Sequence, residues 1–433
     1  MRTSKFQKLF GKWLAILLLA VLIDVPGSID AQSAWRYRNP VEAKNLADPS
    51  VIYGGDHWFY VYATGNGEQN LPVYKSHDLV TWQLAGDAFT DAGRPSFVSG
   101  GGLWAPEIAY VNGQYVLYYA MSTWGGEWAC GIGVATSPTP VGPFTDHGKL
   151  FISSEIGVQN SIDPCHFTDD DGKQYLIWGS FRGIYGIELD ETGLKIKEGA
   201  TKFQIAPGSN TVYNTEASMV MKKGKYYYLF GSSGTCCEGA ASTYHVVVAR
   251  ATNIKGPYVN KAGREVMIYA FETILSKSDR IVGPGHNSEL IEDDNGDWWM
   301  LYHGWNLSNL DAGRELFLDQ VKWDSDGWPY IENGQPSSRA QAPYFSTYVN
   351  TDIANIHTDD NLQIVNHGDN NITFLSKNNI FYSWEILDLN GKVIRQGQGQ
   401  HTKNLWLGNL KNGVYIISLK SAQGNEVQKF VKN

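Results

Sequence analysis

The chain has 433 residues, 42% of them hydrophobic, and carries a formal net charge of −9. This length allows one large domain and a smaller one, and the acidic balance, with no basic run after the N-terminus, argues against nucleic-acid binding. The 15 Trp, 24 Tyr and 17 Phe residues favour a carbohydrate ligand, because aromatic faces stack on the apolar faces of sugar rings, although a β-rich core also uses aromatic residues.

Residues 1–31 have the pattern of a secretory signal peptide. Four basic side chains precede an apolar run over residues 13–23, and small and polar residues follow up to an expected cleavage site near Ala31. A retained membrane anchor is the alternative, but Asp24 and Pro26 interrupt the apolar run. No later segment is long and apolar enough to cross a bilayer, so we expect no stable membrane span.

Five segments then repeat one pattern: a polar or acidic residue, a short apolar strand, a turn and an aromatic-rich strand. They are ADPSVIYGGDHWFYVYAT from Ala47, WAPEIAYVNGQYVLYYA from Trp104, IDPCHFTDDDGKQYLIWGS from Ile162, TEASMVMKKGKYYYLFGSS from Thr215 and HNSELIEDDNGDWWMLYHG from His286.

These repeats predict an all-β fold. Each unit contains about four short strand-like segments. A small antiparallel sheet of that size cannot bury both of its faces alone. Radial packing of the five units gives a five-bladed β-propeller over residues 35–336, with a β-sandwich as the alternative. Aligned on the strands, one column holds Asp48, Ala105, Asp163, Glu216 and Asn287. Equivalent positions of the blades lie on a ring around the central channel, so this column should converge at one mouth of it.

Three members of the column are acids, Asp48, Asp163 and Glu216. Hydrolysis of a glycosidic bond needs one carboxyl group to protonate the leaving oxygen and one carboxylate to activate water or attack carbon. A third carboxylate raises the pKa of its neighbour by repulsion. Taken singly, each acid could belong to a turn or a strand end, and together they could bind calcium. Their shared column favours a glycosidase site.

The motifs LADPSVI, LWAPEIAY, SIDPCHF, NTEASMV and GPGHNSEL, in this order and spacing, resemble glycoside hydrolase family 43. The resemblance covers roughly residues 39–335 and implies a five-bladed propeller with inverting chemistry. It makes Asp48 the general base and Glu216 the general acid. Asp163 would modulate the pKa of the acid and fix its orientation.

Within the family, GSFRGIYGIEL and GSSGTCCEGAASTYHVVVARATNIKGPY look most like the endo-acting arabinan 1,5-α-L-arabinanases. The resemblance implies an arabinan or arabino-oligosaccharide substrate. It also implies sugar contacts from the following residues, with packing of Trp104 between blades as the alternative: Gly102, Trp104, Asn160, Asp163, Ser180 and Phe181.

His286 precedes the fifth column position. Most such histidines are structural, but the equivalent arabinanase histidine faces a channel ion usually assigned as calcium and otherwise held largely by water. The resemblance therefore implies Ca²⁺ at His286, although imidazole is an atypical calcium ligand.

Four cysteines are too few for a disulfide framework at this length. Cys236 and Cys237 are adjacent, with Cα atoms closer than ordinary disulfide geometry prefers, so free thiols are expected.

The blade pattern ends before a polar connector, residues 337–355. In residues 356–433, strand-like segments alternate with turn residues, as in LDLNGKVI and LKNGVYIISL. This pattern predicts a small antiparallel β-sandwich. Composition alone would allow a carbohydrate-binding module. The ending GNLKNGVYIISLKSAQGNEVQKFVKN resembles the C-terminal sorting domain of the type IX secretion system of Bacteroidetes, which implies a partnership with that machinery and a secreted or cell-surface protein.

The sequence therefore predicts a secreted, inverting, endo-acting arabinan hydrolase. An exo-acting α-L-arabinofuranosidase or β-xylosidase on the same scaffold is one alternative. A noncatalytic glycan-binding propeller is another, but pure binding does not require a base, an acid and a modulator together.

Overall fold

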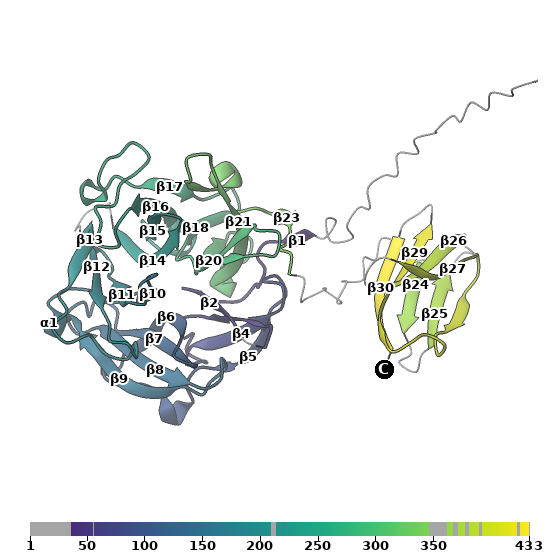
Figure 1. Cartoon of the computed structure of the whole chain (residues 1–433), viewed down its shortest axis with the longest axis horizontal. Helices are drawn as coiled ribbons and strands as arrows, with labels where there is room; N and C mark the ends of the chain where they lie inside the picture. Colours follow the sequence, from purple (N-terminus) through teal and green to yellow (C-terminus); the bar gives the residue numbers. More distant parts are fainter. Residues whose placement is uncertain are drawn as a thin grey trace, which may run out of the picture. The chain divides into compact units, whose positions relative to one another are not determined.

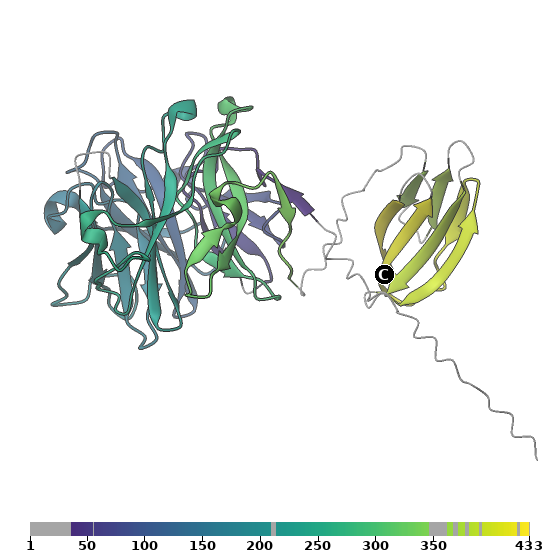
Figure 2. The same ribbon diagram turned by 90° about the horizontal axis from the view of Figure 1, so that it is seen from above.

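The computed structural model describes residues 36–433 except 55, 209–213, 346–361, 367–370, 377–380, 389–391, 422–424 and 433. Five antiparallel sheets are arranged radially around a central channel, and their first strands lie nearest the centre (Figure 1). The sheets run between two faces that carry the connecting loops (Figure 2). This arrangement confirms the predicted five-bladed propeller.

Each blade is an antiparallel meander that starts at the channel. Blades 1 and 2 consist of β2 (Ser50–Tyr53), β3 (Phe59–Tyr62), β4 (Pro72–Ser76), β5 (Gln83–Asp87), β6 (Gly102–Val111), β7 (Gln114–Ser122), β8 (Gly131–Ser137) and β9 (Thr145–Ile152). Blades 3 and 4 consist of β10 (Cys165–Thr168), β11 (Gln174–Trp178), β12 (Arg182–Glu188), β13 (Phe203–Gly208), β14 (Thr215–Lys223), β15 (Tyr226–Ser233), β16 (His245–Ala251) and β17 (Glu272–Leu275).

Blade 5 differs because two short strands share its innermost position. Both β18 (Ile281–Gly285) and β19 (Leu290–Glu292) pair with β20 (Trp298–Asn306), and the sheet continues through β21 (Arg314–Trp323) to β22 (Pro329–Ile331). The interruption between β18 and β19 includes His286.

Helical structure is confined to short segments in the described part of the chain. They are α1 (Ser153–Ile156) and 3-10 turns at Asp91–Gly93, Gly239–Ala241, Val266–Ile268, Leu310–Ala312 and Glu332–Gly334.

Local turn chemistry explains why the inner hairpins form. Asn112 and Gly113 both have positive φ, of 50° and 86°, between β6 and β7, which is the conformation that an Asn-Gly hairpin turn requires. Between β10 and β11, Gly172 has φ 79° and the backbone N–H of Asp169 donates to the carbonyl of Lys173 at 2.9 Å. Asp169, Asp170 and Asp171 are thus turn residues.

The hydrophobic core lies between neighbouring blades. Leu117 and Tyr119 of blade 2 pack with Tyr62 and Val73 of blade 1, and similar clusters join the other blades around the ring. Burial of both sheet faces consumes many of the aromatic residues, because Tyr, Phe and Trp side chains are large enough to fill the space between twisted sheets.

The ring is closed by the N-terminal strand. β1 (Arg36–Arg38) pairs antiparallel with β23 (Arg339–Gln341), which follows blade 5. The Tyr37 hydroxyl donates to the carbonyl of Leu318 at 2.6 Å, and the Asn39 amide donates to the same carbonyl at 2.8 Å. The first and last segments of the propeller are therefore fixed to each other.

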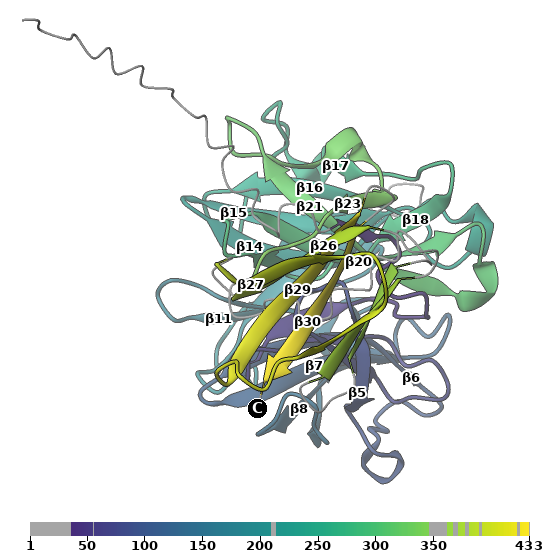
Figure 3. The same cartoon turned by 90° about the vertical axis from the view of Figure 1, so that its right-hand side faces the viewer.

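The C-terminal domain is a separate β unit, as predicted. One sheet has the order β24 (Leu362–Asn366), β25 (Asn371–Ser376), β28 (Lys403–Trp406), and the other β27 (Val393–Gly399), β26 (Tyr382–Asp388), β29 (Gly413–Ser421), β30 (Asn425–Lys432). The four strands of the second sheet lie side by side in Figure 3. Ile372, Phe374, Tyr382 and Ile417 contribute to one core shared by both sheets.

The expectation of free thiols at the adjacent cysteines was wrong. Cys236 and Cys237 form a disulfide in the loop after β15, whereas Cys130 and Cys165 are buried free thiols. The two Cα atoms are 3.8 Å apart, closer than in most disulfides, and the bond lies in a loop and not in a strand. A loop backbone can turn both side chains to one side, and here the Trp305 indole and the Ser242 hydroxyl both donate to the carbonyl of Cys236.

The predicted signal peptide and most of the predicted connector, from residue 346 onward, lie outside the described residues. Within the described part of the chain, no helix is long and apolar enough to cross a membrane.

Candidate active site

Each blade has one non-glycine residue in the left-handed region at or near the start of its inner strand. These residues are Asp48, Ala105, Asp163, Ala217 and His286, with φ between 41° and 56°. The column predicted from the sequence holds the same residues in blades 1 to 3. In blade 4 the equivalent residue is Ala217, one after the predicted Glu216, and in blade 5 it is His286, one before the predicted Asn287. β6 and β14 share one irregularity, a register shift between Trp104 and Glu107 in β6 and between Glu216 and Met219 in β14, which aligns Ala217 with Ala105. Glu216 therefore occupies the blade position that Trp104 has in blade 2.

Asp48 is a buried carboxylate surrounded by cationic and donor groups. Its Oδ1 lies 2.8 Å from an Arg314 guanidinium nitrogen and 3.1 Å from His286 Nδ1. The Thr64 hydroxyl donates to Oδ2 at 2.5 Å. Burial by itself raises the pKa of Asp48, but the charges of Arg314 and His286 hold that pKa well below its usual range. Asp48 is consequently ionised at any pH at which the fold is expected to work.

His303 fixes the backbone at Asp48. The Asp48 N–H donates to His303 Nδ1 at 3.0 Å, which leaves the imidazole proton on Nε2. Burial, helped by the nearby Arg314 charge, lowers the pKa of His303 to about 4, so the ring is neutral. It also stacks on Tyr244, with centroids 5.7 Å apart.

Glu216 has the opposite environment. It is 6% exposed and receives hydrogen bonds from the hydroxyl groups of Ser180 and Tyr244. Burial and the charge of Asp163 raise its pKa to about 7, although both hydroxyl groups and His286 act in the other direction. Of the three acids, Glu216 therefore keeps its proton to the highest pH, up to about neutral.

Asp163 connects the two. Its Oδ2 accepts the backbone N–H of Ala217 at 3.1 Å, so it is tied to the residue next to Glu216. Burial raises its pKa to about 6, with a further upward contribution from the Asp48 charge and a downward one from His286. Asp163 is thus positioned to repel charge on Glu216 and to hold the β14 backbone that carries it.

The structure therefore brings the three predicted acids together with three different protonation behaviours. A carboxylate that stays ionised can accept a proton from water, and a carboxyl group with a raised pKa can donate one to a leaving oxygen. This pair of environments is the requirement for acid and base catalysis of glycoside hydrolysis.

Arg314, His303, Tyr244 and Thr64 were not identified from the sequence. Arg314 and Tyr244 lie outside the five repeat segments, at the starts of later strands in blades 5 and 4, so alignment of the segments could not select them. His303 and Thr64 lie at the ends of the fifth and first repeat segments. A polar side chain at the end of an aromatic-rich strand was the sequence signal that could have identified them.

Of the predicted sugar-contacting residues, Asn160 and Ser180 are buried, whereas Gly102, Trp104 and Phe181 are partly exposed. Asn160 and Ser180 are buried behind Glu216, where the Asn160 amide donates to Ser180 Oγ at 2.9 Å and Ser180 donates to Glu216. Trp104 is partly exposed and meets Trp124 edge to face, with centroids 6.3 Å apart. Gly102 lies against the Trp104 indole, where an added Cβ would clash at 2.4 Å. Phe181 is half-buried and donates its N–H to the carbonyl of Thr215.

A second carboxyl pair lies further along the inner strands. The Ser50 hydroxyl is 3.2 Å from Glu107 and 2.9 Å from Glu289, and the two carboxyl groups also bond each other. Burial and the Glu289 charge raise the pKa of Glu107 well above its usual range. Backbone N–H groups of Val51 and His166 donate to this pair from adjacent blades, so it joins blades 1, 2, 3 and 5.

The geometry at His286 limits what could hold calcium. Its Nδ1 faces Asp48, and burial, which lowers its pKa, is outweighed by the charges of Asp48, Asp163 and Glu216, so that the pKa is raised. Among the described residues no group of three or more His, Cys, Asp or Glu side chains could hold a metal ion. The residues therefore do not form a protein cage for calcium, and the His286 assignment stays a prediction.

Comparison with known proteins identifies the family. The model of glycosyl hydrolases family 43 matches residues 37–329. The chain belongs to this family. It is a glycoside hydrolase, and the family-43 enzyme carries a second match, to the secretion system C-terminal sorting domain, over residues 366–433.

Relatives of this family-43 enzyme include proteins with different modes of action. The extracellular exo-α-(1→5)-L-arabinofuranosidase ArbA of Cellvibrio japonicus is 32% identical over 68% of this chain and 88% of its own. The extracellular endo-α-(1→5)-L-arabinanase 1 of Bacillus subtilis is 31% identical over 76% of this chain and 99% of its own. The α-L-arabinanase of Cellvibrio cellulosa, solved with arabinohexaose, superposes with a TM-score of 0.61 at 30% identity over 67% of this chain and 96% of its own.

Proposed function

We propose that the protein is an endo-acting hydrolase of the α-1,5-linked L-arabinofuranose backbone of arabinan and that it works with inversion. The observation that carries the proposed acid and base chemistry is the contrast between the lowered pKa of Asp48 and the raised pKa of Glu216 in one channel mouth. The substrate class is supported by the arabinan-active relatives, one of which matches over nearly its whole length.

In the proposed mechanism, Glu216 donates its proton to the glycosidic oxygen as the bond to the anomeric carbon breaks. Asp48 accepts a proton from the water that attacks the opposite face of that carbon. Asp163 raises the pKa of Glu216, and Arg314 keeps Asp48 ionised. No step requires a metal ion; a calcium ion bound at His286 would add positive charge near the carboxylates.

Exo action is the alternative that a specific observation supports, because the Cellvibrio japonicus relative at 32% identity is an exo-acting arabinofuranosidase. The two modes differ in the first products. Internal cutting lowers the viscosity of a linear arabinan solution long before much reducing sugar appears, whereas terminal cutting releases short products from the start.

The test uses the mature protein with linear arabinan, branched arabinan and xylan. We expect reducing ends and a series of oligosaccharides from linear arabinan, and NMR should show the inverted anomer as the first product. Release of a single short product overturns endo action, retention of configuration overturns the mechanism, and cleavage of xylan alone overturns the substrate.

We also propose that the protein is exported, first through the signal peptide over residues 1–31 and then through type IX secretion by way of its C-terminal domain. The sorting-domain match supports this. Deletion of residues 356–433 should leave the enzyme inside the outer membrane, which cell fractionation would detect.

A further inference from the structure

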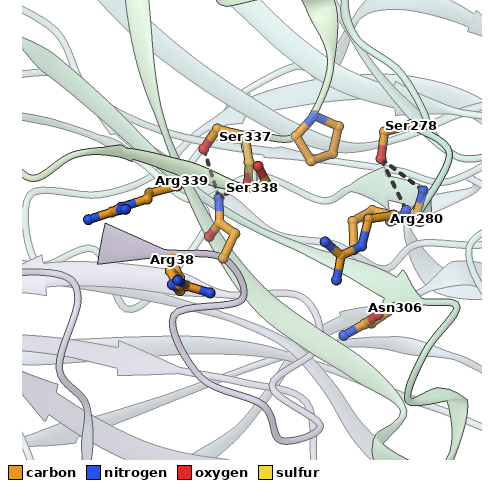
Figure 4. Close-up of a pocket in the computed structure, with 10 residues that line it drawn as sticks. Arg38, Ser278, Arg280, Asn306, Ser337, Ser338 and Arg339 are labelled. Atoms are coloured by element: carbon orange, nitrogen blue, oxygen red, sulfur yellow. Dashed lines mark hydrogen bonds between the residues drawn. The ribbon is translucent and has the colours of Figure 1, made fainter. Parts of the chain in front are cut away.

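A pocket of about 320 Å³ lies beside blade 5, where β1 pairs with β23 (Figure 4). Its volume is in the range of small-molecule sites. Three arginines, three serines and two asparagines provide its polar lining, and no Asp or Glu of the described chain contributes. These residues are Arg38, Arg280, Arg339, Ser278, Ser337, Ser338, Asn39 and Asn306.

The three arginines form a concentration of positive charge on a protein with a net charge of −9. Arg38 and Arg339 are direct cross-strand partners in the β1–β23 ribbon. Like charges placed directly opposite each other destabilise a strand pair. Arg280 and Asn306 lie across the pocket from them (Figure 4). None of the three guanidinium groups makes an ion pair with a carboxylate in the described part of the chain, so no described carboxylate offsets the repulsion.

The remaining polar groups also present donors. Ser278 Oγ accepts the backbone N–H groups of Arg280 and Ile281, at 3.3 and 3.1 Å. Ser337 Oγ accepts the Asn39 amide at 3.2 Å. The Ser337 hydroxyl in turn donates to the buried Asp319 carboxylate behind the pocket wall, so Ser278 is the serine whose hydroxyl proton is left to donate to a ligand. Asn39 further bonds both the N–H and the carbonyl of Leu318, so the serine wall is fixed by the fold.

We propose that this arginine pocket binds the carboxylate of an acidic saccharide, a uronate residue of a polyanionic polysaccharide. Guanidinium groups bind carboxylates through paired hydrogen bonds, and the serine and asparagine donors suit the hydroxyl oxygens of the same sugar. The anion follows from the three arginines alone. The saccharide rests on the proposed function, because a hydrolase of a neutral polysaccharide that also holds an acidic one stays longer on material that contains both polymers.

The test is calorimetric titration of the mature protein with trigalacturonate at low ionic strength. Arg280→Gln and the double variant Arg38→Gln/Arg339→Gln should each weaken binding by tenfold or more, because each removes charge-assisted hydrogen bonds. Arg264→Gln, which removes the same charge from an exposed loop elsewhere, should leave binding unchanged. Raising the salt concentration from 20 to 200 mM should weaken wild-type binding severalfold.

Three results would overturn the proposal: equal binding by the wild type and both pocket variants, equal binding of the methyl-esterified trisaccharide, or inorganic phosphate binding as tightly as trigalacturonate. Hydrolysis of linear arabinan, measured on the same samples, separates this site from the proposed function. The pocket variants should hydrolyse linear arabinan at the wild-type rate. If the wild type were inactive on arabinan, the proposed function would be refuted, and the titration would still measure binding of trigalacturonate to the pocket.

Discussion

Asp48 and Glu216 lie at the same channel mouth and are equally buried, at 7% and 6% exposure, yet their pKa values move in opposite directions. Burial raises both. Asp48 is additionally surrounded by Arg314 and His286, whereas Glu216 faces Asp163 and two neutral hydroxyl groups. Burial is therefore not what distinguishes the base from the acid in this site, because it raises both pKa values. The sign of the nearest charge distinguishes them, and each prediction below alters one such neighbour or the carboxyl group itself.

The largest effect is expected for Glu216→Gln. The amide cannot donate a proton to the leaving oxygen, so kcat on linear arabinan should fall by about 10²- to 10⁴-fold. An aryl arabinofuranoside with an acidic phenol as leaving group needs little protonation and should lose much less. Parallel rate measurements on the two substrates check this.

Asp48→Asn is the matched control for that variant. It removes the base and leaves the acid intact, so both substrates should lose activity to a similar extent. If the aryl substrate rescued Asp48→Asn and not Glu216→Gln, the two roles would have to be exchanged.

Asp163→Asn removes the charge that repels ionised Glu216. The pKa of Glu216 should fall by about one unit from about 7, because a single nearby charge has effects of that size. A general acid acts only while protonated, so the alkaline limb of the kcat/KM profile should move to lower pH, with about fivefold less activity at pH 7. Below about pH 6 Asp163 is itself protonated, and there the variant should differ least from the wild type. An alkaline limb that stays in place contradicts the modulating role.

Arg314→Gln acts on the other carboxyl group. Asp48 must be ionised to accept a proton, so activity is lost as pH falls through its pKa, which Arg314 keeps well below the usual range. Without the guanidinium this pKa should rise by about one unit or more, so the acid limb of the kcat/KM profile should move to higher pH by the same amount, with little change at pH 7. Arg314→Lys, which retains the charge, should behave much like the wild type. Movement of the alkaline limb instead of the acid limb would refute the pairing.

The fold was predictable because five copies of one hairpin pattern are visible in the sequence. In the C-terminal region, strand-like segments and turns alternate with similar regularity. The three acids were predictable because each stands at the start of an inner strand, and a propeller converts that repeated position into a common ring. The alignment located Glu216 only to within one residue, because the hydrophobic pattern does not fix the exact residue at which a strand starts.

The partners of the acids were less predictable. Arg314 reaches Asp48 from β21, 266 residues further along the chain, and no local pattern encodes that contact. Ser180 was selected by resemblance as a sugar contact, and the structure places its hydroxyl on Glu216, with the side chain 1% exposed. The disulfide between Cys236 and Cys237 depends on a loop conformation that spacing alone does not specify.

Ser180→Ala should have the smallest effect, and its direction distinguishes it from Asp163→Asn. The Ser180 hydroxyl donates to Glu216 and favours its ionised form, so its removal should raise the pKa of Glu216 and move the alkaline limb upward by less than one pH unit. The loss of the bond also frees the carboxyl group, so kcat should fall a fewfold, with KM little changed. Ser50→Ala, another buried serine of the channel that bonds Glu107 and Glu289, is the control and should leave the alkaline limb in place. If Ser180→Ala raised KM alone, the hydroxyl would be a sugar contact after all, and Glu216 would owe its orientation to Tyr244 and the backbone.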